Sequence, residues 1–216
     1  MIDLHTHSIF SDGELVPSEL VRRAEFIGYQ AIAITDHADL SNIDFIVPRI
    51  VSVCAELSSK WNILAIPGIE ITHVPPSTIS NLEKRARNMG AKIVVVHGET
   101  TVEPVPAGTN REALLSGIDI LAHPGLITEE ETELAKEKGI YLEITARAGH
   151  SLTNGHVAKL ATRVGAKLVL NSDSHAPGDL ITLEKAKTIA AGAGLSEEEF
   201  NKLRKNSMEI IEKLKV

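Results

Sequence analysis

The chain has 216 residues, enough to bury one full hydrophobic core as a single domain. Its 22 lysines and arginines stand against 29 aspartates and glutamates, which gives a net charge of −7, and aromatic residues make up only 3%. This composition excludes a basic face for long nucleic acid and a row of aromatic platforms for single strands, so we expect a small-molecule partner.

Several features predict a cytoplasmic protein without membrane association. No apolar run approaches the roughly 20 residues that a membrane span needs, and the N-terminal segment lacks the charged start and long apolar stretch of a signal peptide. Cys54 is the only cysteine, which excludes an intrachain disulfide and suits a reducing compartment. The apolar residues around it, in RIVSVCAEL, have helical spacing, which favours a small buried side chain over a nucleophile.

Short runs rich in isoleucine, valine and leucine alternate with longer amphipathic stretches along the whole chain. This alternation is typical of βα units and of a parallel sheet. Strands are predicted at residues 2–5, 31–35, 63–71, 92–97, 118–122, 140–145 and 167–171. Seven such units favour a closed or nearly closed α/β barrel made by one domain over residues 1–216, although an open doubly wound sheet has the same local pattern.

The clearest helices are marked by their end signals. VPSELVRRAEFIGY has a proline near its start and a glycine near its end, and TEEETELAKEKG has acidic residues in its first turn and lysines in its last. The C-terminal stretch LSEEEFNKLRKNSMEIIEKLKV is predicted as one long capped helix. In contrast, HGETTVEPVPAGTN, at residues 97–110, is rich in proline, glycine and threonine, which predicts a long loop and a candidate lid.

Histidines and carboxylates gather at the ends of the predicted strands. The residues concerned are His5, His37, His97 and His123 at strand ends, His7 and His175 just beyond them, and Glu70, Asp173 and Asp12 at or after strand ends. In a parallel barrel the carboxyl ends of all strands meet at one mouth, which is where such folds place their chemistry. Nine side chains of the kinds that bind divalent metals are therefore predicted to converge.

The spacing of the histidines has a direct physical use. Residues i and i+2 of an extended chain project from the same side, so His5 and His7 can reach one ion. The motif DSH has the same spacing, with Asp173 and His175 as the two possible ligands. Buried without ions, so many imidazoles and carboxylates would leave desolvated and mutually repelling groups. The pattern thus predicts a metal centre. The other histidines are expected to be structural or superficial (His73 and His156) or close to substrate (His150).

The ordered motifs DLHTHSIFSDG, ITDH, PGIE, His97, AHPG and DSH resemble the polymerase and histidinol phosphatase (PHP) family of metal-dependent phosphoesterases. The resemblance implies a distorted, TIM-like barrel of seven βα units with two or three divalent ions, Zn, Mn or Fe, at its C-terminal mouth. It places a first ion on His5, His7, Glu70 and Asp173, a second on Glu70, His97 and His123, and a third on Asp12, His37 and His175. Some branches carry histidine where this chain has Asp12, so the third site differs in affinity or metal.

The implied activity is hydrolysis of a phosphate ester by a hydroxide that bridges two ions, with Glu70 and Asp173 as the catalytic carboxylates. Arg147, after the sixth strand, is expected to bind the phosphate of the substrate. Glu143 is expected either to orient a ligand or to pair with Arg147. Asp3 and Asp36 either fix the tautomers of neighbouring histidines or turn away from the site.

Three functions are compatible with these motifs. The first is a histidinol-phosphatase-like enzyme that hydrolyses a small-molecule phosphate monoester, which fits the short acidic chain and Arg147. The second is a phosphodiesterase, nucleotide phosphatase or short-oligonucleotide 5′ exonuclease, a branch that usually carries an inserted segment for which this chain has no room. The third is a non-enzymatic scaffold that binds a partner, which the full set of metal-binding side chains opposes. The natural substrate, the metal and the oligomeric state stay open.

Overall fold

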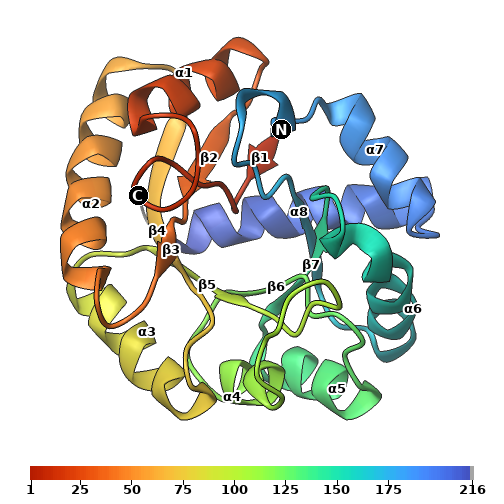
Figure 1. Ribbon diagram of the computed structural model, residues 1–216. Helices are drawn as coiled ribbons and strands as arrows, with labels where there is room; N and C mark the ends of the chain where they lie inside the picture. The colour runs from red at the N-terminus through yellow and green to blue at the C-terminus, as the bar shows by residue number, and fades with distance from the viewer. Residues whose placement is uncertain (215–216) are drawn as a thin grey trace.

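The strands form one parallel sheet that curls almost into a closed barrel (Figure 1). The computed structural model describes residues 1–214. Around the sheet the strands follow the order β1 (Ile2–Asp3), β2 (Ala31–Ile34), β4 (Leu64–Ile71), β5 (Ile93–His97), β6 (Ile120–Ala122), β7 (Tyr141–Thr145) and β8 (Leu168–Asn171). A parallel bridge between Thr6 and Ser174 joins the two edges. The predicted barrel and its seven strands are confirmed.

Two strands near the N-terminus differ from the prediction. β1 ends at Asp3, two residues earlier than predicted, because the chain beyond it bonds to the segment after β8: the Asp173 N–H donates to the His5 carbonyl at 3.0 Å and the His7 N–H to the Ser174 carbonyl at 2.8 Å. A further short strand, β3 (His37–Ala38), follows β2 and pairs with β4, which puts His37 directly beside Glu70.

Helices cover the outside of the sheet (Figure 1). They are α1 (Pro17–Phe26), α2 (Ile43–Lys60), α3 (Ile79–Asn88), α4 (Thr109–Leu114), α5 (Glu129–Lys138), α6 (Asn154–Val164), α7 (Leu183–Gly192) and α8 (Glu197–Leu214), with 3₁₀ turns η1 (Pro76–Thr78), η2 (His150–Thr153) and η3 (Pro177–Asp179). The three helices predicted from their end signals are α1, α5 and α8, and the last two residues of the predicted C-terminal helix lie outside the described residues. No described helix is long and apolar enough to cross a membrane.

The barrel interior is filled by aliphatic side chains and is closed at one end by α8. Ile210 of α8 packs with Ile2 and Tyr141 in the cluster that fills the barrel, and α8 crosses behind the sheet in Figure 1. Cys54 lies buried in α2, as predicted, and its burial raises the pKa of the thiol to about 12. With α8 at the amino ends of the strands, the mouth at their carboxyl ends is left for chemistry.

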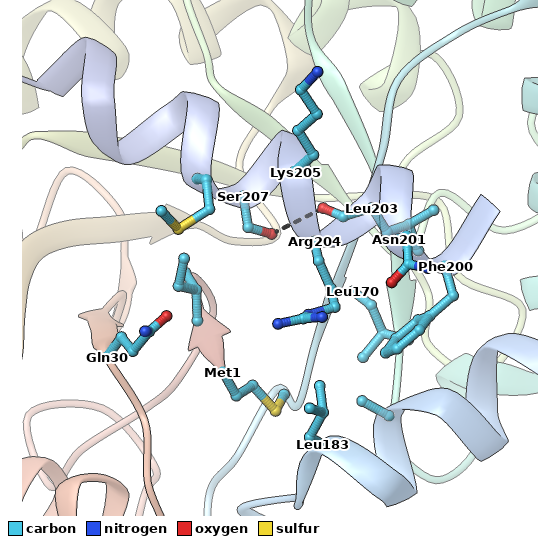
Figure 2. Close-up of a pocket in the computed structure, with 13 residues that line it drawn as sticks. Met1, Gln30, Leu170, Leu183, Phe200, Asn201, Leu203, Arg204, Lys205 and Ser207 are labelled. Carbon is cyan, nitrogen blue, oxygen red and sulfur yellow. Dashed lines mark hydrogen bonds between the residues drawn. The ribbon is translucent and has the colours of Figure 1, made fainter. Parts of the chain in front are cut away.

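A cavity of about 300 Å³ lies between α7, α8 and the start of β1 (Figure 2). It is lined by Met1, Ile2, Gln30, Leu170, Leu183, Ala186, Phe200, Asn201, Leu203, Arg204, Lys205, Ser207 and Met208. This lining includes no histidine, cysteine or carboxylate, so the cavity offers neither a metal ligand nor a general base. The chemistry must therefore be sought at the carboxyl ends of the strands.

Candidate metal centre

The nine side chains predicted to bind metal lie around the mouth of the barrel. They come from the segment after β1 (His5, His7 and Asp12), from β3 (His37), β4 (Glu70) and β5 (His97), and from the segments after β6 (His123) and β8 (Asp173 and His175). All of them except Asp12, His37 and His175 are buried. The parallel register of neighbouring strands brings together groups that are far apart in the sequence.

The innermost group consists of His5, His7, Glu70 and Asp173. The His5 Nε2 lies 3.4 Å from Glu70 Oε1 and 3.7 Å from Asp173 Oδ1, and the His7 Nε2 lies 3.2 Å from Asp173 Oδ1 and 3.7 Å from Glu70 Oε2. Most of these separations exceed a normal hydrogen bond. Two ligands of one tetrahedral ion at bond lengths of about 2.0–2.1 Å lie about 3.3–3.4 Å apart, so the group has the spacing of an ion's coordination shell.

Several polar atoms of this centre are buried and lack a hydrogen-bond partner. They are His5 Nε2, both ring nitrogens of His7, Glu70 Oε1 and His123 Nδ1. A buried polar atom without a partner costs about 1–3 kcal/mol, which a bound cation would recover. Burial, together with the neighbouring histidines, holds the pKa of His7 and His123 well below its usual range, so both rings are neutral and able to bind metal. The residues present therefore fit divalent ions.

A second group at the mouth contains Asp12, His37 and His175, with His7 beside them. The Asp12 Oδ1 lies 3.3 Å from His175 Nε2 and 3.5 Å from His37 Nε2, and the His7 and His175 rings stack at 4.1 Å. Although partial burial opposes the shift, His175 and His37 lower the pKa of Asp12 to about 2, so its carboxylate is charged. The three side chains that the family resemblance assigns to one ion thus lie together.

The residues that the resemblance assigns to the second ion, Glu70, His97 and His123, are arranged differently. The His123 Nε2 lies 3.6 Å from Glu70 Oε1 and 3.7 Å from Asp173 Oδ2, which places it with the innermost group. Within residues 1–214, no nitrogen of His97 lies within 4.0 Å of a Glu70 oxygen; the carboxylate beside His97 is that of Glu103, at 3.1 Å. The sequence alone did not predict a role for Glu103, because it indicated only the length of the loop that carries this residue.

Glu143 forms hydrogen bonds to two of the segments that carry the predicted metal ligands. Its Oε1 accepts hydrogen bonds from His5 Nδ1 at 2.8 Å and from Asn171 Nδ2 at 2.8 Å, and its Oε2 accepts one from the His123 N–H at 3.2 Å. The first of these contacts fixes the His5 ring so that Nε2 faces Glu70 and Asp173. Of the two roles predicted for Glu143, the structure shows the orienting contact to a candidate ligand and not the pair with Arg147.

Asp3 and Asp36 turn away from the rings that they were considered to orient. Asp36 accepts hydrogen bonds from the Ser8 N–H and hydroxyl at 2.7 Å each and from the Ser11 hydroxyl at 2.8 Å, while Asp3 accepts one from the Ser172 N–H at 3.2 Å. Neither carboxylate contacts a ring nitrogen in the described part of the chain. Asp36 instead fixes the short loop that carries Asp12.

Arg147 lies at the mouth, held by a residue that the sequence did not reveal. Its Nη1 donates to Asp179 Oδ2 at 3.2 Å, and the same oxygen accepts the backbone N–H groups of His175 at 3.0 Å and Ala176 at 2.8 Å. Asp179 thus links the guanidinium to the segment that carries His175. In the sequence, the only feature that could have indicated a role for Asp179 is its position shortly after the motif DSH.

The remaining histidines separate into two kinds. His156 donates through Nε2 to the Ile127 carbonyl at 2.7 Å, the structural role expected of it. His73 and His150 both contact Glu103, so His73 is not merely superficial. His73 and Asp173 have φ of 53° and His123 has φ of 26°, values that are rare outside glycine and that cluster at functional sites.

Comparison with known proteins places this geometry in a family. The PHP domain profile matches residues 3–187. The sequence is 52% identical over 200 residues to "Uncharacterized protein MJ1295" of Methanocaldococcus jannaschii, a match that covers 92% of each chain. It is 26% identical over 227 residues to a "Probable phosphatase" of Thermoanaerobacter sp. (strain X514), covering 92% of this chain and 88% of the relative.

Two solved structures share the barrel fold. Histidinol phosphate phosphatase from Lactococcus lactis, in complex with zinc, L-histidinol and phosphate, has a TM-score of 0.62 at 21% identity and is matched over 90% of this chain and 94% of its own. A chain of archaeal ribonuclease P with mature tRNA has a TM-score of 0.77 at 16% identity, over 99% of this chain and 91% of its own. At these identities the likeness concerns the fold alone.

Proposed function

The chain belongs to the PHP domain family, and from this premise we propose that it is a metal-dependent phosphoesterase that hydrolyses small phosphate monoesters. The observation that carries the proposal is the innermost group, in which buried imidazoles and carboxylates without hydrogen-bond partners have the spacing of metal ligands. The "Probable phosphatase" among the relatives, and the zinc and phosphate in the Lactococcus structure, support the same class of reaction.

His5, His7, Glu70 and Asp173 would hold one ion, and Asp12, His37 and His175 another. Divalent ions bound there supply Lewis acidity toward the phosphoryl oxygens and a nucleophilic water near neutral pH. A mixed set of imidazoles and carboxylates suits Zn, Mn or Fe.

The protein itself contributes position and charge. Glu143 fixes the ring of His5, and the backbone bonds that join the two ends of the sheet fix the strand ends that carry His5, His7 and Asp173. Arg147 contacts Asp179 through Nη1, which leaves its other N–H groups available to donate to a terminal phosphate. A monoester presents more terminal oxygens for such contacts than a diester, which supports the monoester as substrate class.

A substrate panel tests this proposal. Purified protein supplied with Mn²⁺ or Zn²⁺ should release phosphate from small phosphomonoesters faster than it cleaves phosphodiesters or short oligonucleotides. Glu70→Gln, purified in parallel, is the control for contaminating phosphatases and should be inactive because it lacks a central carboxylate. Preferential cleavage of diesters or oligonucleotides would instead favour the diesterase branch, and no activity on any of them would favour a non-enzymatic scaffold.

A further inference from the structure

Outside the innermost group, the long loop after β5 brings a carboxylate among three imidazoles. We call this the outer cluster: His73, His97, Glu103 and His150. The Glu103 Oε2 lies 2.9 Å from His73 Nε2 and 3.1 Å from His97 Nε2, and its Oε1 lies 3.4 Å from His150 Nε2. Only His97 belongs to the set of nine predicted ligands, so the cluster is largely additional to the centre described above.

The base of the loop that carries Glu103 is fixed by hydrogen bonds and packing. Glu99 and Asn110 bond reciprocally, with the Glu99 N–H donating to Asn110 Oδ1 and the Asn110 N–H to Glu99 Oε1, both at 2.9 Å. Gly125 has φ of 62° and lies so close to the Glu99 carbonyl that a Cβ there would clash. The Thr100 hydroxyl, in turn, contacts His150 Nδ1 at 2.8 Å. The loop thus lies against the β6 segment and η2.

The two ring nitrogens of His97 face two different oxygen atoms. The His97 Nδ1 lies 3.2 Å from the Gly98 carbonyl, which can only accept, so a neutral ring that donates to this carbonyl carries its proton on Nδ1. Its Nε2 lone pair then points at a carboxylate oxygen only 3.1 Å away. Two acceptors at this distance repel each other unless a positive charge lies near both.

The spacing of the outer cluster also fits an ion. The Glu103 Oε2 lies 2.9 and 3.1 Å from the Nε2 atoms of His73 and His97, a few tenths of an ångström less than the value of about 3.3 Å for two ligands of a tetrahedral ion, and the three residues can offer one ligand atom each to a common ion. We infer that His73, His97 and Glu103 form a further cation site, which takes a divalent transition-metal ion and fastens the loop over the mouth of the barrel. Two ligands from outside the loop and one from within it would make loop closure depend on metal.

Metal titration without substrate tests this inference independently of any phosphoesterase activity. Protein stripped by a chelator is titrated with Zn²⁺ by calorimetry, and bound zinc is counted by elemental analysis. Glu103→Gln and His73→Asn should each bind about one equivalent less than the wild type, since two remaining strong ligands hold an ion poorly. Asparagine is chosen because it tolerates the positive φ of His73. Glu112→Gln, an exposed glutamate on α4, is the matched control and should bind as the wild type does.

Hydrogen exchange of residues 98–108 supplies the second readout. Zn²⁺ should slow exchange of these amides in the wild type and in Glu112→Gln but not in Glu103→Gln or His73→Asn. If either variant keeps the full zinc stoichiometry, or if exchange in the wild-type loop is unaffected by Zn²⁺, the cluster is an ordinary set of hydrogen bonds and the inference is wrong. Circular dichroism of each variant establishes that the comparison is made between folded proteins.

Discussion

The Glu143 carboxylate accepts a hydrogen bond from His5 Nδ1 at 2.8 Å, and both side chains are completely buried. Although burial opposes the shift, the carboxylates of Glu143, Glu70 and Asp173 raise the pKa of His5 well above its usual range. A cation placed at His5 Nε2 would face two of these carboxylates, those of Glu70 and Asp173. The contact therefore orients the ring and also leaves the centre with an excess of negative charge that favours a metal ion.

We expect Glu143→Gln to weaken metal binding while the fold is retained. Glutamine preserves the shape of the side chain but removes the charge that orients and polarises His5, and loss of such a supporting contact typically costs about 10–100-fold in metal affinity. Competition with a fluorescent zinc chelator measures the change. An unaltered zinc affinity, in a variant whose circular dichroism matches the wild type, would show that Glu143 serves only to satisfy Asn171 and the His123 N–H.

Glu70→Gln and Arg147→Ala should affect catalysis in different ways. Glu70 contacts His5, His7, His37 and His123, so its loss disturbs the whole centre and should lower kcat by several orders of magnitude. Arg147 is partly exposed and lies outside the histidine groups, so its loss should chiefly raise KM for a monoester. Steady-state kinetics on the best substrate of the panel distinguish the two. Equal losses of kcat would assign Arg147 to the transition state rather than to substrate binding.

Asp12→Ala should remove about one metal equivalent and leave the innermost group occupied, because His37 and His175 alone make a poor site. Folding should be retained, since Asp12 is half exposed in a loop at the mouth. The rate should fall by about 10²-fold, as charge on the phosphoryl group loses an electrostatic partner. Elemental analysis and kcat check both expectations, and excess Mn²⁺ should restore part of the rate. Unchanged metal content would show that Asp12 is only a turn residue before Gly13.

Removal of metal should destabilise the protein, because buried ring nitrogens and the Glu70 Oε1 would lack partners. An ion present at 100 times its dissociation constant adds about 2.7 kcal/mol. For a chain of this length that corresponds to roughly 5–10 °C in Tm for each site. Differential scanning fluorimetry with and without EDTA, followed by re-addition of Zn²⁺, measures the shift. Identical melting curves would mean that the centre is stable without ions.

The sequence by itself determined the parallel βα units and the residues at the carboxyl ends of their strands. Runs of β-branched residues predict strands locally, and the parallel arrangement places every carboxyl end at one opening, so His5, Glu70 and His123 had to meet there. The ends of α5 are also determined by local sequence. Thr128 and Glu131 form a capping box, and Gly139 ends the helix with a positive φ.

Only the tertiary structure decided which of these groups contact one another. Glu143 reaches His5 across 138 positions of sequence, Arg147 contacts Asp179, and His97 faces Glu103 instead of Glu70. Strand periodicity gives the face on which a side chain lies, but these pairings depend on the curvature of the sheet and on the path of long loops. Both are set by packing between distant segments, as where Gly125 lies against the Glu99 carbonyl, and no local pattern encodes that contact.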